Sequence, residues 1–240
     1  MSKGFSTSSL TRGLLVDIDI YRIKHPSYLS RSVTTCSDSS NKPINELSNS
    51  ISRQGLLHPI VVRAKAGTDY FEIVAGNRRY EACKALGWRK IVCHVLELDD
   101  KEAYEVTLIE NLQRENLNPI EEAHSFKVYV EEYGWGGISD LASRLGKSVS
   151  YVDKRLRLLN SSPELIKSVY DRSINPSIAE ELSPINDEKV LHGFVTMISK
   201  SRLSSRNVRK LVKEYREEPS SGIYNYNYVE DKIIDIDRKV

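Results

Sequence analysis

Apolar and polar residues alternate through the first hundred positions in short runs that predict a small sheet. Four strands are expected, at residues 14–23, 56–63, 70–74 and 91–98. A polar turn at 66–69 joins the middle two strands as a hairpin. Helical spacing predicts one helix from Pro43 to Gly55 and another from Gly76 to Gly87. This part of the chain is therefore predicted to be an α+β domain with helices on one side of a sheet.

Beyond Asp99 the apolar residues recur at the spacing of helices, and residues 119–218 are predicted to form an all-α second domain. Asp99 and Glu102 form a capping-box pattern before a helix whose inward face is expected to carry Ala103, Val106, Ile109 and Leu112. Asn118 and Pro119 begin another helix that runs to about Tyr133. Later helices are expected at residues 163–171, 187–200 and 205–217.

Two short helices joined by Gly146 have the spacing of a helix-turn-helix. The first, from Ile138, turns Leu141, Ala142 and Leu145 inward. The second begins at Ser148 and turns Val152, Leu156 and Leu159 inward. Residues 138–160 contain five bases and two acids, a net charge of +3, which suits a phosphate-lined groove.

The exposed face of the second helix supplies the candidate DNA contacts. Lys147 and Ser148 are expected to hold phosphates, while Ser150, Tyr151 and Lys154 are placed to reach base edges. Arg155 belongs to the same presented set. A helical hairpin that binds no DNA is the alternative interpretation.

The domain organisation follows from these patterns. A flexible leader is expected at 1–13, an α+β domain at 14–118, a helical domain at 119–218 and a short tail at 219–240. A polar loop rich in Ser and Thr is expected at 30–42. The tail either adds an edge strand or stays disordered.

Charge is distributed unevenly although the net charge is only +2. Residues 97–123 carry nine acids and two bases, whereas residues 199–216 carry seven bases and one acid. Separate faces for separate partners are therefore expected. For the basic helix at 205–217, a fully solvated helix and contacts to a DNA backbone are both open.

The cysteines and the apolar runs exclude several classes of protein. The three cysteines, Cys36, Cys83 and Cys93, have no CxxC spacing and suggest neither a zinc site nor a disulfide framework. The chain has no signal-peptide pattern and no apolar run of membrane-spanning length. A cytoplasmic protein without a membrane partner is expected.

The turn at Gly76 has the chemistry of a phosphate site. A strand ends at Ala75, the glycine allows a ligand close to the backbone, and the free N–H groups of the next helix point outward. Arg78 and Arg79 add two cations there, although cations oppose the dipole of a helix N-terminus. The alternative is a plain turn followed by a solvated first turn.

Glu110 and Asn111 form a second candidate site. A carboxylate beside a side-chain amide can hold a hard divalent cation together with a phosphate oxygen. A solvated acid on an acidic helix is the alternative interpretation of Glu110.

Four stretches, taken in order, resemble the ParB partition proteins. They are GLLHPIVVR at 55–63, GNRRYEA at 76–82, ENLQRENLNPIEEA at 110–123, and the helix-turn-helix around Gly146, Lys147 and Ser148. The resemblance covers residues 14 to about 185. It implies a ParB/sulfiredoxin-like N-terminal domain followed by a helix-turn-helix domain.

The resemblance further implies a DNA clamp that is gated by CTP and Mg²⁺. The turn at Gly55, His58 and Pro59 would read the cytosine. Gly76, Asn77, Arg78 and Arg79 would hold the triphosphate, and Glu110 and Asn111 would meet phosphates and magnesium. The DNA would be a palindromic centromere-like site, held by a homodimer on the nucleoid or a plasmid, and a ParA-type ATPase is a candidate partner.

Two departures from the family pattern have consequences. Asn77 stands where the family usually has Glu, and an amide cannot accept a proton as a carboxylate does, so at most weak CTPase activity is expected. No catalytic residue is assigned. The residues after Glu218 are too few and too polar for the family's usual C-terminal dimerising domain, so dimerisation is expected to depend on DNA, nucleotide or the helices at 163–217.

Three alternatives stay open at the level of the sequence. A ParB-like transcriptional regulator would use the same parts. A nucleotide-free DNA-binding adaptor would use the first domain only to dock a partner ATPase. A nucleotide-dependent enzyme similar to sulfiredoxin would need a reactive cysteine beside the phosphate turn, where this chain has Asn77 and Arg78, with Cys83 further along the helix.

Overall fold

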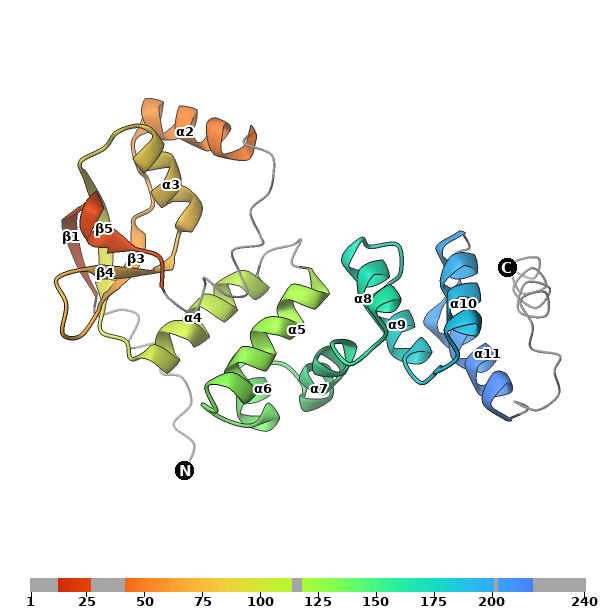
Figure 1. Cartoon of the computed structure of the whole chain (residues 1–240). Helices are drawn as coiled ribbons and strands as arrows, with labels where there is room; N and C mark the ends of the chain where they lie inside the picture. Colours follow the sequence, from red (N-terminus) through yellow and green to blue (C-terminus); the bar gives the residue numbers. More distant parts are fainter. Residues whose placement is uncertain (1–12, 27–41, 114–117, 201–202, 218–240) are drawn as a thin grey trace. The chain divides into compact units, whose positions relative to one another are not determined.

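The chain forms two compact units. The computed structural model of the protein describes residues 13–26, 42–113, 118–200 and 203–217. Met1–Leu117 and Ser143–Lys147 make up the first unit, and Asn118–Ala142 and Ser148–Val240 make up the second. Four expected features lie outside the described residues: the leader at 1–13 except for its last residue, the tail at 219–240, Cys36, and almost all of the polar loop at 30–42. Figure 1 confirms the predicted fold class, an α+β domain followed by an all-α domain.

The first unit is built on a five-stranded sheet of order β1-β5-β3-β4-β2. Its strands are β1 (Leu14–Asp19), β2 (Ile23–Lys24), β3 (Ile60–Ala64), β4 (Phe71–Ala75) and β5 (Lys90–Leu96). β1 pairs antiparallel with β5, and β3 lies between a parallel β5 and an antiparallel β4. The predicted hairpin is present, with Lys65 and Tyr70 joined by a backbone hydrogen bond of 3.2 Å.

The prediction of a single strand at 14–23 is wrong, because this segment forms two strands that lie at opposite edges of the sheet. The 3-10 helix η1 (Ile20–Arg22) separates them, and the Asp19 carboxylate accepts a hydrogen bond of 3.0 Å from the Tyr21 N–H. The chain then continues as β2, which pairs parallel with β4. Ile18, Ile20 and Ile23 are all buried. The alternating pattern persists across the break, so the pattern alone did not reveal it.

Helices α2 (Lys42–Gln54) and α3 (Asn77–Ala85) pack on this sheet. Both were predicted. Their inward residues join the strands in one apolar core that includes Ile51, Ile60, Ile73, Tyr80 and Cys83. This core holds the start of α3 firmly against the end of β4.

Helix α4 (Asp100–Leu112) begins with the predicted capping box. The Asp99 carboxylate accepts from the Glu102 N–H at 2.7 Å, and the Glu102 carboxylate accepts from the Asp99 N–H at 3.0 Å. The inward face differs from the expectation, because of the four expected residues only Ala103 is buried. Thr107 is buried instead, since its hydroxyl has a carbonyl partner on β4.

The second unit is entirely helical in the residues described. It contains α5 (Pro119–Lys127), the π-helical turn η3 (Val128–Glu132), α6 (Ile138–Leu145), α7 (Val149–Leu158), α8 (Pro163–Tyr170), α9 (Pro176–Leu182), α10 (Glu188–Lys200) and α11 (Ser205–Glu217). The last residues of α6 belong to the first unit. A single apolar core runs through α5, α7 and the helices after them.

Two findings in this unit correct the sequence interpretation. Helix α9 was not predicted, although Asn175 and Pro176 supply an N-cap and a first-turn proline. Helix α11 is not a fully solvated helix, because Val208, Leu211 and Val212 are buried in the core. Among the described residues no helix is both long and apolar enough to cross a bilayer.

Candidate nucleotide and DNA-binding sites

The turn at Gly76 is a position that only glycine fits. Gly76 is the N-cap of α3 with φ of 99°, in the left-handed region that other residues rarely adopt. A Cβ built on it would lie 2.6 Å from Ile60 Cγ2. The backbone therefore passes close to Ile60 of β3 with no room for a side chain. Among the described residues no side chain caps the start of α3, so its first N–H groups have the arrangement that binds anions at helix N-termini.

Arg79 joins the two stretches that the resemblance assigns to the nucleotide. Its Nη1 donates to the carbonyl of His58 at 2.8 Å and to the carbonyl of Pro59 at 2.7 Å. The guanidinium thus holds the turn at 55–59 beside the Gly76 corner. The sequence assigned Arg79 to the triphosphate alone and did not reveal this bond to the turn. Arg78, one residue earlier, is exposed on the first turn of α3.

The turn at 55–59 presents apolar surface beside the corner. Gly55 ends α2 with φ of 76°, and its N–H donates to the Ile51 carbonyl at 2.8 Å. Leu57 is 71% exposed. This turn is therefore held in place at both ends while its middle stays open to solvent.

His25 is a neighbour of the corner that sequence reasoning missed. Its Nδ1 lies 3.0 Å from Asn77 Oδ1, and its Nε2 lies 2.9 Å from Glu81 Oε1. The ring also packs edge-on against Tyr80, whose hydroxyl donates to the Ile23 carbonyl. No signal in the sequence connects position 25 to position 77, because the contact arises only once β2 is placed next to β4.

Glu110 and Asn111 lie side by side in the last turn of α4 and are half-buried. A carboxylate oxygen and an amide oxygen are hard ligands of the kind that Mg²⁺ takes, usually with water and substrate phosphates completing its shell. Within the described residues there is no cluster of three or more His, Cys, Asp or Glu side chains that could hold a metal without such help. The donor set therefore fits a magnesium ion that arrives with a phosphate, and the ion would neutralise the phosphate's charge.

The two described cysteines do not supply a reactive thiol. Cys83 and Cys93 are both fully buried. Burial raises the pKa of Cys83, although Arg79 nearby acts in the opposite direction, and burial raises the pKa of Cys93 to about 12. Cys83 therefore lacks the thiolate that the sulfiredoxin-like alternative requires.

The predicted second helix of the helix-turn-helix is α7, and its first turn is exposed. The Ser148 hydroxyl caps the helix by accepting from the Tyr151 N–H at 3.1 Å. Lys147, Ser148, Val149 and Ser150 are all exposed. Gly146, with φ of 64°, makes the preceding turn as expected. Val152 is buried as predicted, but Leu156 and Leu159 are only half-buried and Leu158 is buried in their place.

Three of the expected DNA contacts have partners within the protein. Glu122 on α5 accepts from the Tyr151 hydroxyl at 2.6 Å and from Arg155 Nε at 2.9 Å. Burial, followed by this hydrogen bond, raises the pKa of Tyr151. Lys154 pairs with Glu180 on α9 at 2.9 Å. Tyr151 and Arg155 thus fix α7 on α5, and the exposed start of α7 is the part open to a groove.

The sequence matches two domains of one family. Residues 6–112 match the ParB N-terminal domain, and residues 115–217 match the ParB HTH domain. The chain belongs to the ParB family. The expectation from the four stretches of residues is thereby confirmed.

Curated relatives of this family member include nucleoid occlusion proteins. That of Halalkalibacterium halodurans is 36% identical over 175 residues, which is 73% of this chain and 61% of the relative. That of Bacillus mycoides is 38% identical over 177 residues, which is 72% of this chain and 60% of the relative. The chain thus spans about three fifths of the length of these relatives.

Solved ParB structures share the fold. ParB from Caulobacter crescentus, C-terminally truncated and complexed to the centromeric parS site, is 28% identical with a TM-score of 0.62, over 83% of this chain and 99% of that chain. A pNOB8-like ParB N-domain is 17% identical with a TM-score of 0.52, over 93% of this chain and 96% of that chain. The fold of this ParB-family chain is therefore the one seen in solved ParB proteins.

Proposed function

We propose that this chain is a DNA clamp of the ParB family that is gated by CTP and Mg²⁺ and acts on a palindromic site. The observation that carries the proposal is the bond from Arg79 to the His58 and Pro59 carbonyls. It joins a glycine corner suited to phosphates and an open turn suited to a base, so one nucleotide can span both. Arg79 is therefore not a freely solvated side chain of the first turn, because its guanidinium is bonded to the turn before β3.

In this proposal Gly76, Asn77 and Arg78 bind the triphosphate, and Gly55, His58 and Pro59 contact the cytosine. Arg79 holds the two halves together. Glu110 and Asn111 hold the magnesium ion and the phosphates that it bridges. Asn77 in place of a carboxylate favours binding over turnover, so the nucleotide acts as a switch that is released slowly.

The DNA side of the proposal assigns the groove to the start of α7. Lys147 and Ser148 contact phosphates, and Ser150 reaches base edges. Lys154 is available once its exposed pair with Glu180 exchanges for a phosphate, because exposed ion pairs are weak. Tyr151 and Arg155 orient α7 through Glu122. Two copies would bind the two halves of a palindrome, as the symmetry of such a site requires.

Retention on closed DNA tests the proposal. A palindrome selected by the protein from a random pool is attached at both ends, and dissociation is followed at physiological salt. CTP with Mg²⁺ is expected to slow dissociation on the palindrome and not on a scrambled duplex. The Arg79→Ala variant should lose the nucleotide effect and keep the initial binding, whereas Lys154→Ala should lose the initial binding. The proposal fails if no palindrome is selected and CTP changes nothing.

The curated relatives suggest the biological setting. They are named nucleoid occlusion proteins, and we infer that this chain acts on the nucleoid in a related role. A transcriptional regulator with the same parts is the second candidate. The two differ in the number of sites bound across a genome, which chromatin mapping measures directly.

A further inference from the structure

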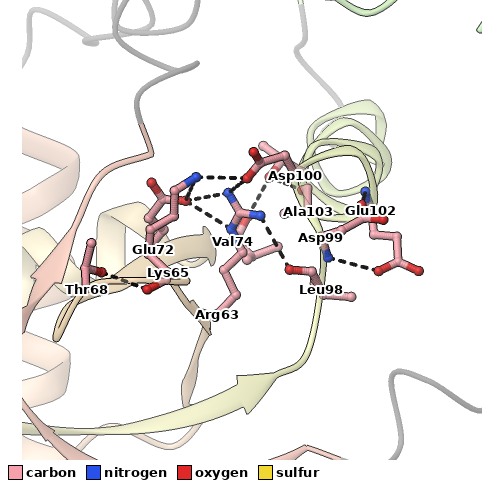
Figure 2. A network of polar contacts seen from close by, with 11 residues as sticks. Arg63, Lys65, Thr68, Glu72, Val74, Leu98, Asp99, Asp100, Glu102 and Ala103 are labelled. Carbon is pink, nitrogen blue, oxygen red and sulfur yellow. Dashed lines mark hydrogen bonds and ion pairs between the residues drawn. The ribbon is translucent and has the colours of Figure 1, made fainter. Parts of the chain in front are cut away.

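A buried ion pair links two neighbouring strands of the first unit. Arg63 on β3 and Glu72 on β4 face each other in the sheet register. Arg63 is only 3% exposed, and its Nε donates to Glu72 Oε2 at 3.0 Å. Figure 2 shows this pair at the centre of a larger network. Because a buried ion pair adds little net stability over an apolar pair, its particular contribution is a fixed direction for the guanidinium.

The same guanidinium reaches the first turn of α4. Arg63 Nη2 donates to Asp100 Oδ1, and Nη1 lies 3.4 Å from the Leu98 carbonyl just before the helix. Lys65, two residues further along the chain, donates its Nζ to the same Asp100 oxygen at 2.9 Å. These bonds, drawn in Figure 2, tie the N-terminus of α4 to the β3–β4 hairpin.

A second tie lies nearer the other end of α4. The Thr107 hydroxyl lies 3.0 Å from the Val74 carbonyl and 2.9 Å from the Ala103 carbonyl, both of which it can donate to. Thr107 is buried and stands three residues before Glu110. Val74 stands two residues before Gly76. This bond therefore connects the Glu110 end of α4 to the strand that leads into the phosphate corner.

Helix α4 is thus bonded to the sheet at two points along its length, which restrains it more than one point would. From Asp100 to Glu110 the helix rises about 15 Å, at about 1.5 Å per residue. Hydrogen bonds at only one point would let the helix change its angle to the sheet. Bonds at both Asp100 and Thr107 fix that angle and the position of the helix along β4. The distance between Glu110 and the Gly76 corner is then set by the sheet.

We propose that Asp100, held by Arg63 and Lys65, and Thr107 are positioning residues for the Glu110–Asn111 pair. They place that pair for the magnesium ion and phosphates of the nucleotide without touching either. The inference rests on the proposed function, because it assigns a supporting group to the same site. Groups that hydrogen-bond a metal ligand directly commonly change metal affinity about ten- to a hundredfold. Because Asp100 and Thr107 act on Glu110 and Asn111 through the helix, we expect the low end of that range.

The test compares CTP affinity with Mg²⁺ and with EDTA. For Asp100→Ala and Thr107→Val, CTP affinity in Mg²⁺ is expected to fall about tenfold, while affinity in EDTA stays within about twofold of wild type. Loss of overall stability would instead weaken both. Asp100 is 59% exposed, so its removal leaves the core intact. Two controls should match wild type: Asp17→Ala, an exposed acid on β1, and Thr107→Ser, which keeps the hydroxyl.

The outcomes separate the two proposals. Equal losses in Mg²⁺ and EDTA, or no loss in either, overturn the positioning role while CTP binding by the wild type leaves the proposed function standing. If the wild type binds no CTP in either condition, the proposed function and the positioning role for a nucleotide both fall. Amide hydrogen exchange in the nucleotide-free protein gives a second reading, because Asp100→Ala and Thr107→Val should speed exchange across residues 104–112 and Asp17→Ala should not.

Discussion

At the scale of single residues, the account depends on a glycine and an arginine that have different tasks. Gly76 lets the backbone pass within reach of Ile60, and Arg79 binds the carbonyls of the neighbouring turn. The task of Gly76 depends on its immediate surroundings, whereas that of Arg79 depends on carbonyls about twenty positions earlier in the chain. A substitution at Gly76 should therefore act through backbone strain and crowding, which its surroundings define.

Gly76→Ala is expected to lower the free energy of unfolding by about 3 kcal/mol. About 1–2 kcal/mol of this comes from the left-handed backbone and the rest from the new methyl group pressing on Ile60. The matched control is Gly67→Ala, because Gly67 has φ of 74° but no heavy atom within 4 Å of the place that an added methyl group would take. That variant should lose only about 1 kcal/mol. Urea denaturation measures both, and equal losses would contradict a crowded corner.

The sequence predicted the glycine corner but not the partners of its arginine. A glycine after a strand and before a helix is a local signal, and so are the two arginines that follow. The bond from Arg79 to residues 58 and 59 spans about twenty positions and depends on how α3 packs over β3. The Arg63–Glu72 pair was within reach of the sequence, since a hairpin turn at 66–69 places these positions opposite each other. The contact of His25 with Asn77 was not.

At the scale of elements, α4 and α7 are each fixed by a few polar bonds. For α4 the hydrogen bond from Lys65, then the bond and charge of Arg63, lower the pKa of Asp100 below its ordinary 3.8. A carboxyl whose pKa is lowered by folding stabilises the protein above its unfolded pKa, and it loses that contribution as the pH falls through the folded value.

The free energy of unfolding of wild type should therefore exceed that of Asp100→Ala at neutral pH, and the difference should narrow as the pH falls below 3.8. Urea denaturation at a series of pH values measures the difference. A difference that is constant with pH would mean that Asp100 contributes by packing and not by charge.

A buried carboxylate of α5 holds two side chains of helix α7. Glu122 accepts from both Tyr151 and Arg155, so its removal takes away a hydrogen bond from each and leaves Arg155 with the longer pair to Glu180, at 4.0 Å. Glu122→Ala is expected to cost about 3 kcal/mol, at the low end for breaking a buried ion pair. Asp153→Ala, which breaks only the exposed pair with Arg157, should cost about 0.5 kcal/mol or less. Thermal denaturation that ranked the two variants equally would contradict this role for Glu122.

The pattern of apolar residues predicted most helices and strands, and its failures have physical causes. Strands β1 and β2 were merged because the alternation continues through the 3-10 turn between them. The buried face of α4 differs from the predicted face because Thr107, although polar, is buried with its hydroxyl hydrogen-bonded to the Val74 carbonyl. Helix α11 looked solvated because its basic residues surround a narrow apolar stripe, and Arg209 is itself paired with Glu181 on α9.

At the scale of the whole molecule, the chain carries a candidate nucleotide-binding site in the first unit and a candidate DNA-binding surface centred on the second. Membership of the ParB family and the likeness to a ParB structure bound to parS support the DNA side. The acidic stretch at 97–123 and the basic stretch at 199–216 show that charge is separated along the chain. The account requires that a nucleotide bound in the first unit alters the grip of the helices on a duplex.

The most direct test is calorimetric titration of the purified protein with CTP and Mg²⁺, compared with ATP, GTP and UTP. The account predicts one CTP per chain, at least about tenfold tighter than the other three, a discrimination of about 1.4 kcal/mol. The heat should vanish in Arg78→Ala and persist in Asp17→Ala. Equal binding of all four nucleotides would contradict the account, because CTP would then not be the specific ligand. No heat with any of them would also contradict it and would leave a nucleotide-free DNA-binding adaptor.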